Sequence, residues 1–385
     1  MADDIVTRAS RDSAPVDEDN TQAVDDDDEE MPRFQLTRRR ILLFGFFVVS
    51  SIAFLYFVLP QLAGLDDTWN RIERGDPWWM ALAFVFEVLS IGGYVIMFRT
   101  VCAPGAARID WRASYEITMA GIAATRLFAA GGAGGVVLTA WALRRAGMEK
   151  RIVACRMVAF LALLYAVYMG AMIVTGIGLR TGLFPGGGSF GVTVIPAIFA
   201  AVTIVVFLGI ALVPGDFERR LGNWSKGDSW RARWARRLAT VPASTASGVR
   251  TAIRLVRSGD PSLLGAFAWW GFNVAILWAC FHAFGHAPPM AVIVMGFLVG
   301  MLGNLLPLPG GVGGVDGGMI GALIAFGVEP GLVVVAVLSY RAFSFWLPTL
   351  PGVIAYFQLR HTVADWDEEP RVLARAPTIK SEVKG

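Results

Sequence analysis

Residues 41–60 form the stretch ILLFGFFVVSSIAFLYFVLP, twenty consecutive residues without a charged side chain. At 1.5 Å per residue, a helix of this length crosses the hydrocarbon core of a bilayer, which is about 30 Å thick. Similar runs recur along the 385 residues, and 55% of the chain is hydrophobic, more than is usual in a soluble domain. The sequence therefore predicts an all-α, polytopic membrane bundle. The further predicted spans cover 78–98, 152–178, 192–213, 262–286 and 331–357.

Lysine and arginine are distributed unevenly between the loops, and this bias orients membrane proteins with the basic loops inside. Arg38, Arg39 and Arg40 precede the first run, and the loop 214–261 holds ten basic residues. The loop 179–191 on the opposite side holds one, Arg180. We therefore expect a multi-pass protein of the plasma membrane with both termini in the cytoplasm.

The segments outside the apolar runs complete the predicted domain organisation. Residues 1–36 are acidic and polar and are expected to be a disordered cytoplasmic tail, because they cannot bury enough apolar surface to fold. Residues 37–360 form the transmembrane domain, with halves at about 41–178 and 192–357, and residues 361–385 form a second cytoplasmic tail. Within the basic loop, 230–238 is either an amphipathic helix on anionic lipid or a solvated segment. Nucleic acid is not an expected partner.

Two apolar regions, 114–147 and 289–327, are interrupted by glycine clusters. The helices beside each break are too short to span a bilayer, so each region predicts a re-entrant hairpin. Two full spans joined by a short loop would leave the flanking loops on the same sides of the membrane, so the distribution of arginines does not exclude that alternative. Each half runs span, span, hairpin, span, and the halves start on opposite sides, which predicts an inverted repeat. The candidate cavity-lining glycines are Gly131, Gly132, Gly134, Gly135, Gly310, Gly311, Gly313 and Gly314. The alternative is that these glycines only let helices pack closely.

Charged side chains within apolar runs are costly in a membrane and need a partner or water. Arg156 and Arg341 follow the two hairpins at similar distances, and arginine binds phosphate with a planar, permanently charged fork. Asp316 is expected to pair with an arginine, hold a cationic group or carry a proton; internal ion pairs that only order the bundle are the alternative. The five candidate substrate-binding charges are Glu87, Arg126, Arg156, Asp316 and Arg341. No catalytic residue, metal ligand or cofactor is expected, and His282 and His286 are assigned to packing.

The stretch from Pro309 to Asp316, together with Tyr340-Arg341, resembles the flippase-like transmembrane domain of lysyl-phosphatidylglycerol synthases. The resemblance covers roughly residues 40–360 and implies lipid translocation or binding. Two residues depart from the family pattern: Asp316 stands where a glutamate is common, and Val136 follows Gly135 where the family usually has a glutamate. We also expect no aminoacyl-transferring soluble domain, so the resemblance does not imply lipid aminoacylation.

These observations favour a protein that moves or binds an anionic phospholipid or a polyprenyl-linked lipid. A membrane-embedded enzyme acting on a lipid-linked substrate and a scaffold for envelope synthesis remain the alternatives. The expected partners are membrane lipids, and homo-oligomerisation and contacts with envelope-synthesis proteins are left open.

Overall fold

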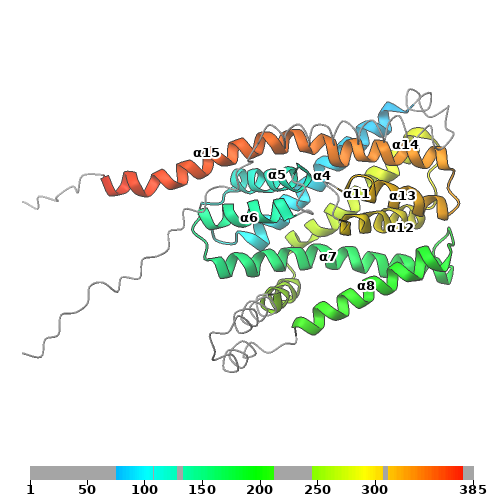
Figure 1. Ribbon diagram of the computed structural model, residues 1–385, viewed down its shortest axis with the longest axis horizontal. Helices are drawn as coiled ribbons and strands as arrows, with labels where there is room; N and C mark the ends of the chain where they lie inside the picture. Colours follow the sequence, from blue (N-terminus) through cyan, green and yellow to red (C-terminus); the bar gives the residue numbers. More distant parts are fainter. Residues whose placement is uncertain (1–74, 107, 128–132, 212–244, 307–310, 376–385) are drawn as a thin grey trace, which may run out of the picture. The chain divides into compact units, whose positions relative to one another are not determined.

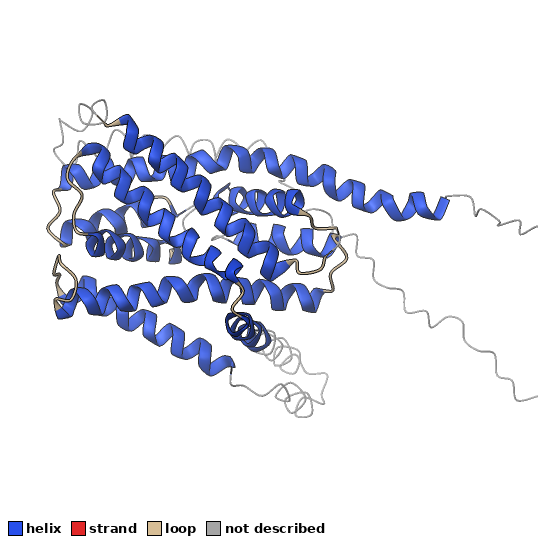
Figure 2. Cartoon of the chain, turned by 180° about the vertical axis from the view of Figure 1, so that it is seen from behind, coloured by secondary structure: helices blue, strands red, loops and turns tan. Residues whose placement is uncertain are grey.

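The computed structural model describes residues 75–106, 108–127, 133–211, 245–306 and 311–375 (Figure 1). Every regular element in these ranges is a helix, as Figure 2 shows from the opposite side. The predicted span 41–60, the acidic tail 1–36 and the segment 230–238 lie outside the described residues. Gly131, Gly132 and Gly310 also lie outside them.

Five helices in the described ranges are long and apolar enough to cross a membrane. They confirm five of the predicted spans and the expected all-α, multi-pass membrane bundle. These helices are α4 (Pro77–Cys102), α7 (Lys150–Thr181), α8 (Phe190–Ala211), η3 (Pro261–Leu264) with α11 (Gly265–Phe284), and α14 (Pro330–Arg341) continued by η6 (Ala342–Trp346) and α15 (Leu347–Arg375).

The last span continues well beyond residue 357, where the sequence placed its end, because α15 runs to Arg375. Leu359, Val363 and Trp366 are buried, and their i, i+4, i+7 spacing makes an apolar stripe along an otherwise polar helix. Packing of α15 against α5 is reinforced where Thr362 Oγ1 donates to Glu116 Oε2 at 2.6 Å. The average hydropathy after residue 357 is too low to predict a membrane span, because only the narrow apolar stripe of the helix is buried.

The two glycine-broken regions form pairs of short helices. The first pair is α5 (Trp111–Leu127) and α6 (Ala133–Arg145); the second is α12 (Met290–Met301), extended by η4 (Leu302–Leu305), and α13 (Gly314–Ala325). Helices α12 and α13 have 12 residues each. Each is therefore about 18 Å long at 1.5 Å per residue, well short of a bilayer core.

The two short pairs enter the bundle from opposite ends. The Asp76 N–H, just before α4, donates to the Ala283 carbonyl near the end of α11 at 3.0 Å, so α4 and α11 pack as antiparallel neighbours. The first pair follows the C-terminal end of α4, whereas the second follows the C-terminal end of α11. In Figure 1 these pairs lie to the left and to the right, with α7 running beside both. The inverted repeat and the re-entrant placement of the hairpins in a bilayer stay predictions. Both require that the two short pairs enter from opposite ends, as they do here.

Glycines let the helices of each pair approach closely. A Cβ added to Gly135 would overlap the Gly121 carbonyl across the first pair, and one added to Gly300 would lie 2.6 Å from the Met319 Cβ across the second. Gly93 and Gly265 make the same kind of contact between α4 and α11. Close packing by small residues, the alternative reading of the glycines, therefore applies at Gly135, which is one of the eight candidates.

Candidate functional site

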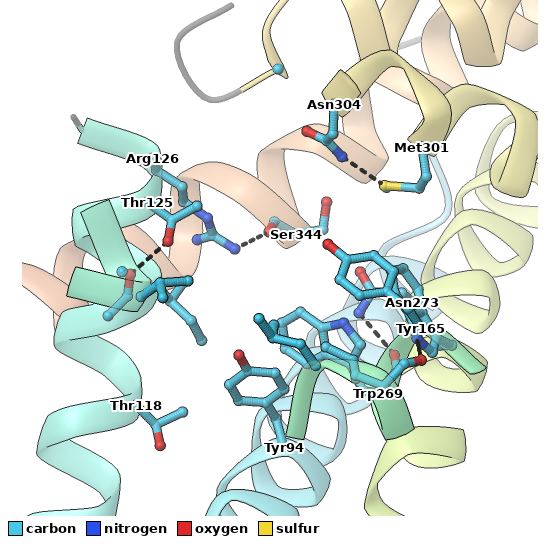
Figure 3. A pocket seen from close by; sticks show the side chains of 18 of the residues that line it. Tyr94, Thr118, Thr125, Arg126, Tyr165, Trp269, Asn273, Met301, Asn304 and Ser344 are labelled. Atoms are coloured by element: carbon cyan, nitrogen blue, oxygen red, sulfur yellow. Dashed lines mark hydrogen bonds between the residues drawn. The ribbon is translucent and has the colours of Figure 1, made fainter. Parts of the chain in front are cut away.

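A cavity of about 380 Å³ lies between the two short-helix pairs. Its wall includes Gly135 and Arg126 from the first pair, Met301 and Asn304 from the second, and Arg341 from the last span. Figure 3 shows Thr125 and Arg126 on one side of it and Tyr94, Trp269 and Asn273 on another. The described residues that flank both glycine breaks thus meet around one space, as expected if broken backbone at membrane depth lines a cavity.

An ion pair joins the second break to the last span. The Arg341 Nε lies 2.6 Å from Asp316 Oδ1, and the two residues are 7% and 1% exposed. Asp316 is the third residue of α13, and its Oδ2 accepts a hydrogen bond from the Gly313 N–H at 2.8 Å. The Asp316 carboxylate therefore caps the N-terminus of α13 and also pairs with Arg341. Arg341 lines the cavity, whereas Asp316 is not part of its wall.

Arg126 connects the first pair to the same span through backbone carbonyls. Its Nη2 donates to the Ser344 carbonyl at 2.7 Å and its Nη1 donates to the Phe345 carbonyl at 2.8 Å. Proline lacks an N–H and displaces the carbonyl four residues earlier, and here Pro348 follows Ser344 by four. The π turn Ala342–Trp346 marks the resulting distortion of the helix. Arg126 thus satisfies a carbonyl that the proline leaves without a helical donor.

This pairing predicts that Arg126 and Pro348 are energetically coupled. Arg126→Ala should destabilise the protein by about 1–3 kcal/mol, because it leaves the Ser344 carbonyl unsatisfied away from water. Pro348→Ala should recover at least half of that loss, because the new N–H can bond Ser344. A double-mutant cycle on thermal unfolding midpoints in detergent measures the coupling. Pro351→Ala is the matched control, since the carbonyl four residues before it belongs to Leu347; equal rescue by both prolines would refute the assignment.

The two cavity arginines also share an aromatic ring. The guanidinium carbons of Arg126 and Arg341 lie 5.3 Å and 4.5 Å from the centroid of the Phe345 ring. The two positive charges repel each other, and Glu87 attracts Arg126. Glu87 is 2% exposed, and its Oε2 has no hydrogen-bond partner among the described residues. Two guanidiniums held this close make a site where an anion is stabilised.

A closed polar network supports another part of the wall. The Tyr340 hydroxyl donates to Asn273 Oδ1 at 3.0 Å, and Asn273 Nδ2 donates to Ser90 Oγ and to the Trp269 carbonyl, each at 2.9 Å. These side chains are almost fully buried, so their polar atoms need the partners they have. The network joins α4, α11 and α14 and holds Tyr340 directly before Arg341.

The structure brings together some of the residues expected at the site and leaves others apart. Arg126 and Arg341 line the cavity together with Gly135 and Gly311. Asp316 and Glu87 are buried next to those arginines, and Gly313 and Gly134 lie in the described backbone beside the breaks. Gly314 packs its backbone against Gly303 within the second pair.

Arg156 does not join this cluster. Its Nη1 donates at 3.1 Å to the carbonyl of Val101, in the last turn of α4, and it is not part of the cavity wall. Carbonyls at a helix C-terminus have no helical partner, and a basic side chain stabilises them. The similar positions of Arg156 and Arg341 after the two glycine-broken regions therefore do not correspond to equivalent surroundings.

Sequence reasoning did not single out Phe345 or Asn273, and it used Tyr340 only as part of the motif that carries the family resemblance. Asn273 carried the best available indication, since it is a lone amide in the apolar run 262–286, and a polar side chain at that depth needs a partner. Nothing in the pattern distinguishes Phe345 from the other aromatic residues of the last span, because its role depends on two arginines from different helices.

Similarity to known proteins agrees with this architecture. The sequence matches the family described as "Lysylphosphatidylglycerol synthase TM region" over residues 42–352. It is also similar to two proteins named UPF0104 membrane protein from Methanothermobacter thermautotrophicus. One is 24% identical over 322 residues, covering 80% of this chain and 93% of the relative. The other is 25% identical over 350 residues, covering 85% and 96%. The chain is therefore a member of the lysylphosphatidylglycerol synthase TM region family of membrane proteins.

Proposed function

We propose that this protein binds the phosphate-bearing head group of an anionic phospholipid or polyprenyl-linked lipid and moves it between the two leaflets. The observation that carries the proposal is that Arg126 and Arg341, from the two halves of the chain, line one cavity between the glycine-broken helix pairs. Arginine recognises phosphate through parallel, charge-assisted hydrogen bonds. An anion between the two guanidiniums would also relieve their mutual repulsion.

The size of the cavity supports a head group as its ligand. A volume of about 380 Å³ lies at the lower end of the range for small-molecule sites, about 300–1,000 Å³. Acyl or prenyl chains would remain in the surrounding lipid. The helix α8 offers them an apolar outer surface, where Ile198, Val202 and Val205 are more than half exposed.

Basic residues at one end of the bundle support a cytoplasmic location for that end. Arg99 lies in the last turn of α4, Arg144 and Arg145 in the last turn of α6, and Lys150 begins α7. These helix ends are joined by short connections and therefore lie on the same side. The positive-inside bias favours the cytoplasmic face of the plasma membrane for them.

The test is transbilayer exchange by the purified protein in vesicles. Phosphatidylglycerol with a fluorescent acyl chain is placed in both leaflets, and dithionite is added outside to bleach the accessible fraction. Wild-type protein should make nearly all of the label accessible, whereas protein-free vesicles should keep about half protected. Arg341→Lys retains the charge that pairs with Asp316 but loses the fork, so exchange should slow about tenfold or more, the equivalent of one charge-assisted hydrogen bond.

Arg180→Lys is the matched control. Arg180 is exposed in the last turn of α7, at the opposite end from the basic helix termini. Its substitution should leave exchange unchanged. Exchange no faster than in empty vesicles, or equal rates for Arg341→Lys and wild type, would contradict the proposal.

A further inference from the structure

The cavity wall has an unusual charge composition. Among the described residues that line it, Arg126 and Arg341 are charged, and none is acidic. The remaining polar side chains are neutral, including Thr139 and Asn304. The break segments 128–132 (FAAGG) and 307–310 (PLPG), which the structure does not describe, contain no acidic residue in their sequence.

Two buried carboxylates interact with these arginines but are not part of the wall. Asp316 pairs with Arg341 and accepts from the Gly313 N–H, and it is 1% exposed. Glu87 is 2% exposed and interacts electrostatically with Arg126. Asp316 therefore neutralises Arg341 from the buried side, and Glu87 lies outside the wall, while both arginines line the cavity. A ligand in the cavity meets positive charge and neutral hydrogen-bonding groups.

This asymmetry has a consequence for head-group chemistry. A phosphate is favoured beside the guanidiniums, and hydroxyl groups can bond to neutral side chains such as Asn304 and Thr139. An ammonium group would be confined near two positive charges without a carboxylate to accept its hydrogen bonds. Like charges held together in a site of low dielectric are strongly unfavourable.

We propose that the cavity selects anionic, hydroxyl-bearing head groups, such as glycerol phosphate or sugar phosphate diesters, and rejects head groups that carry an amine. This inference rests on the proposed function, because it assigns the class of lipid head group that the same cavity accepts. It concerns selectivity between lipids and not the existence of transport.

The first experiment compares head groups on the wild-type protein. Acyl-labelled phosphatidylglycerol, phosphatidylserine and phosphatidylethanolamine are each tested in the dithionite assay. Phosphatidylglycerol and phosphatidylserine carry the same net charge, and phosphatidylserine carries an ammonium that phosphatidylglycerol lacks. We expect phosphatidylglycerol to exchange at least tenfold faster than either amine-bearing lipid.

The second experiment places a carboxylate in the wall. Val136, in the first turn of α6, lines the cavity, whereas its neighbour Val137 is not part of the wall. The two side chains are 39% and 52% exposed, so either position has room for a longer side chain. Val136→Glu should reduce the preference for phosphatidylglycerol over phosphatidylethanolamine at least threefold. Val137→Glu, the matched control, should leave that ratio unchanged.

The outcomes separate the two proposals. If no labelled lipid exchanges faster than in protein-free vesicles, the proposed function fails and the selectivity fails with it. If all three lipids exchange at equal rates, transport stands and the selectivity is overturned. An equal change in preference for Val136→Glu and Val137→Glu would also overturn it. The wild-type comparison needs no variant, so the inference is tested even if Val136→Glu does not fold.

Discussion

Gly303→Ala is expected to destabilise the protein by at least about 2 kcal/mol, because it forces apart the two helices of the second short pair. An added Cβ would lie 2.5 Å from the backbone nitrogen of Val315 and closer still to the carbonyl group of Gly314. Both neighbours are backbone atoms at the start of α13, so no side-chain rotation can make room. Overpacking typically costs about 1–3 kcal/mol, and more where the surroundings cannot move.

Gly321→Ala is the matched control within the same pair. Gly321 lies in α13 with nothing within 4 Å of an added Cβ, and its backbone is helical. Alanine there should be neutral or stabilise by about 0.5–1 kcal/mol, since glycine is the weaker helix former. Thermal unfolding in detergent, followed by size-exclusion chromatography, measures both variants. A Gly303→Ala protein as stable as Gly321→Ala would show that the close approach of α12 and α13 contributes little to stability.

The membrane-spanning helices were predictable because long apolar runs have few alternatives in lipid. Residues 152–178 and 262–286 were placed within a few residues of α7 and of η3 with α11. The short helices beside the glycine breaks were equally accessible, since length alone separates α12 and α13 from a span. In both cases the determining property is local in the sequence.

Properties that depend on tertiary contacts were not accessible in the same way. The same argument, that a charge within an apolar run needs a partner, selected both Arg126 and Arg156 as candidate site residues. Arg126 bonds the Ser344 carbonyl, which Pro348 leaves without a helical donor, and Arg156 bonds the Val101 carbonyl at the end of α4. Which carbonyl lies unsatisfied beside an arginine is fixed by packing between distant segments, and no spacing in the sequence encodes it. The extension of α15 to Arg375 was not predicted for a related reason, since its apolar stripe stabilises the helix only by packing against α5.

Removing either partner of the Asp316–Arg341 ion pair alone is expected to cost about 3–5 kcal/mol, because the remaining charge stays buried without compensation. Arg341→Met leaves the carboxylate of Asp316, and Asp316→Asn leaves the guanidinium of Arg341. The double variant should be more stable than either single variant. Its asparagine can still accept the Gly313 N–H that closes α13, and its methionine fills much of the arginine's volume.

Thermal unfolding midpoints of the wild type, the two single variants and the double variant in detergent measure the coupling between the two charges. The exchange assay on the same samples measures whether the pair is needed for transport. If the pair only orders the bundle, the folded double variant should transport lipid as the wild type does. If Arg341 binds the phosphate, the double variant should be folded and exchange phosphatidylglycerol at least tenfold more slowly. Additive stability losses would show that the two charges are not a pair in the membrane protein. Recovery of stability without recovery of exchange is the result that the cavity geometry leads us to expect, because Asp316 pairs with the arginine from behind and, of the two partners, only Arg341 lines the cavity.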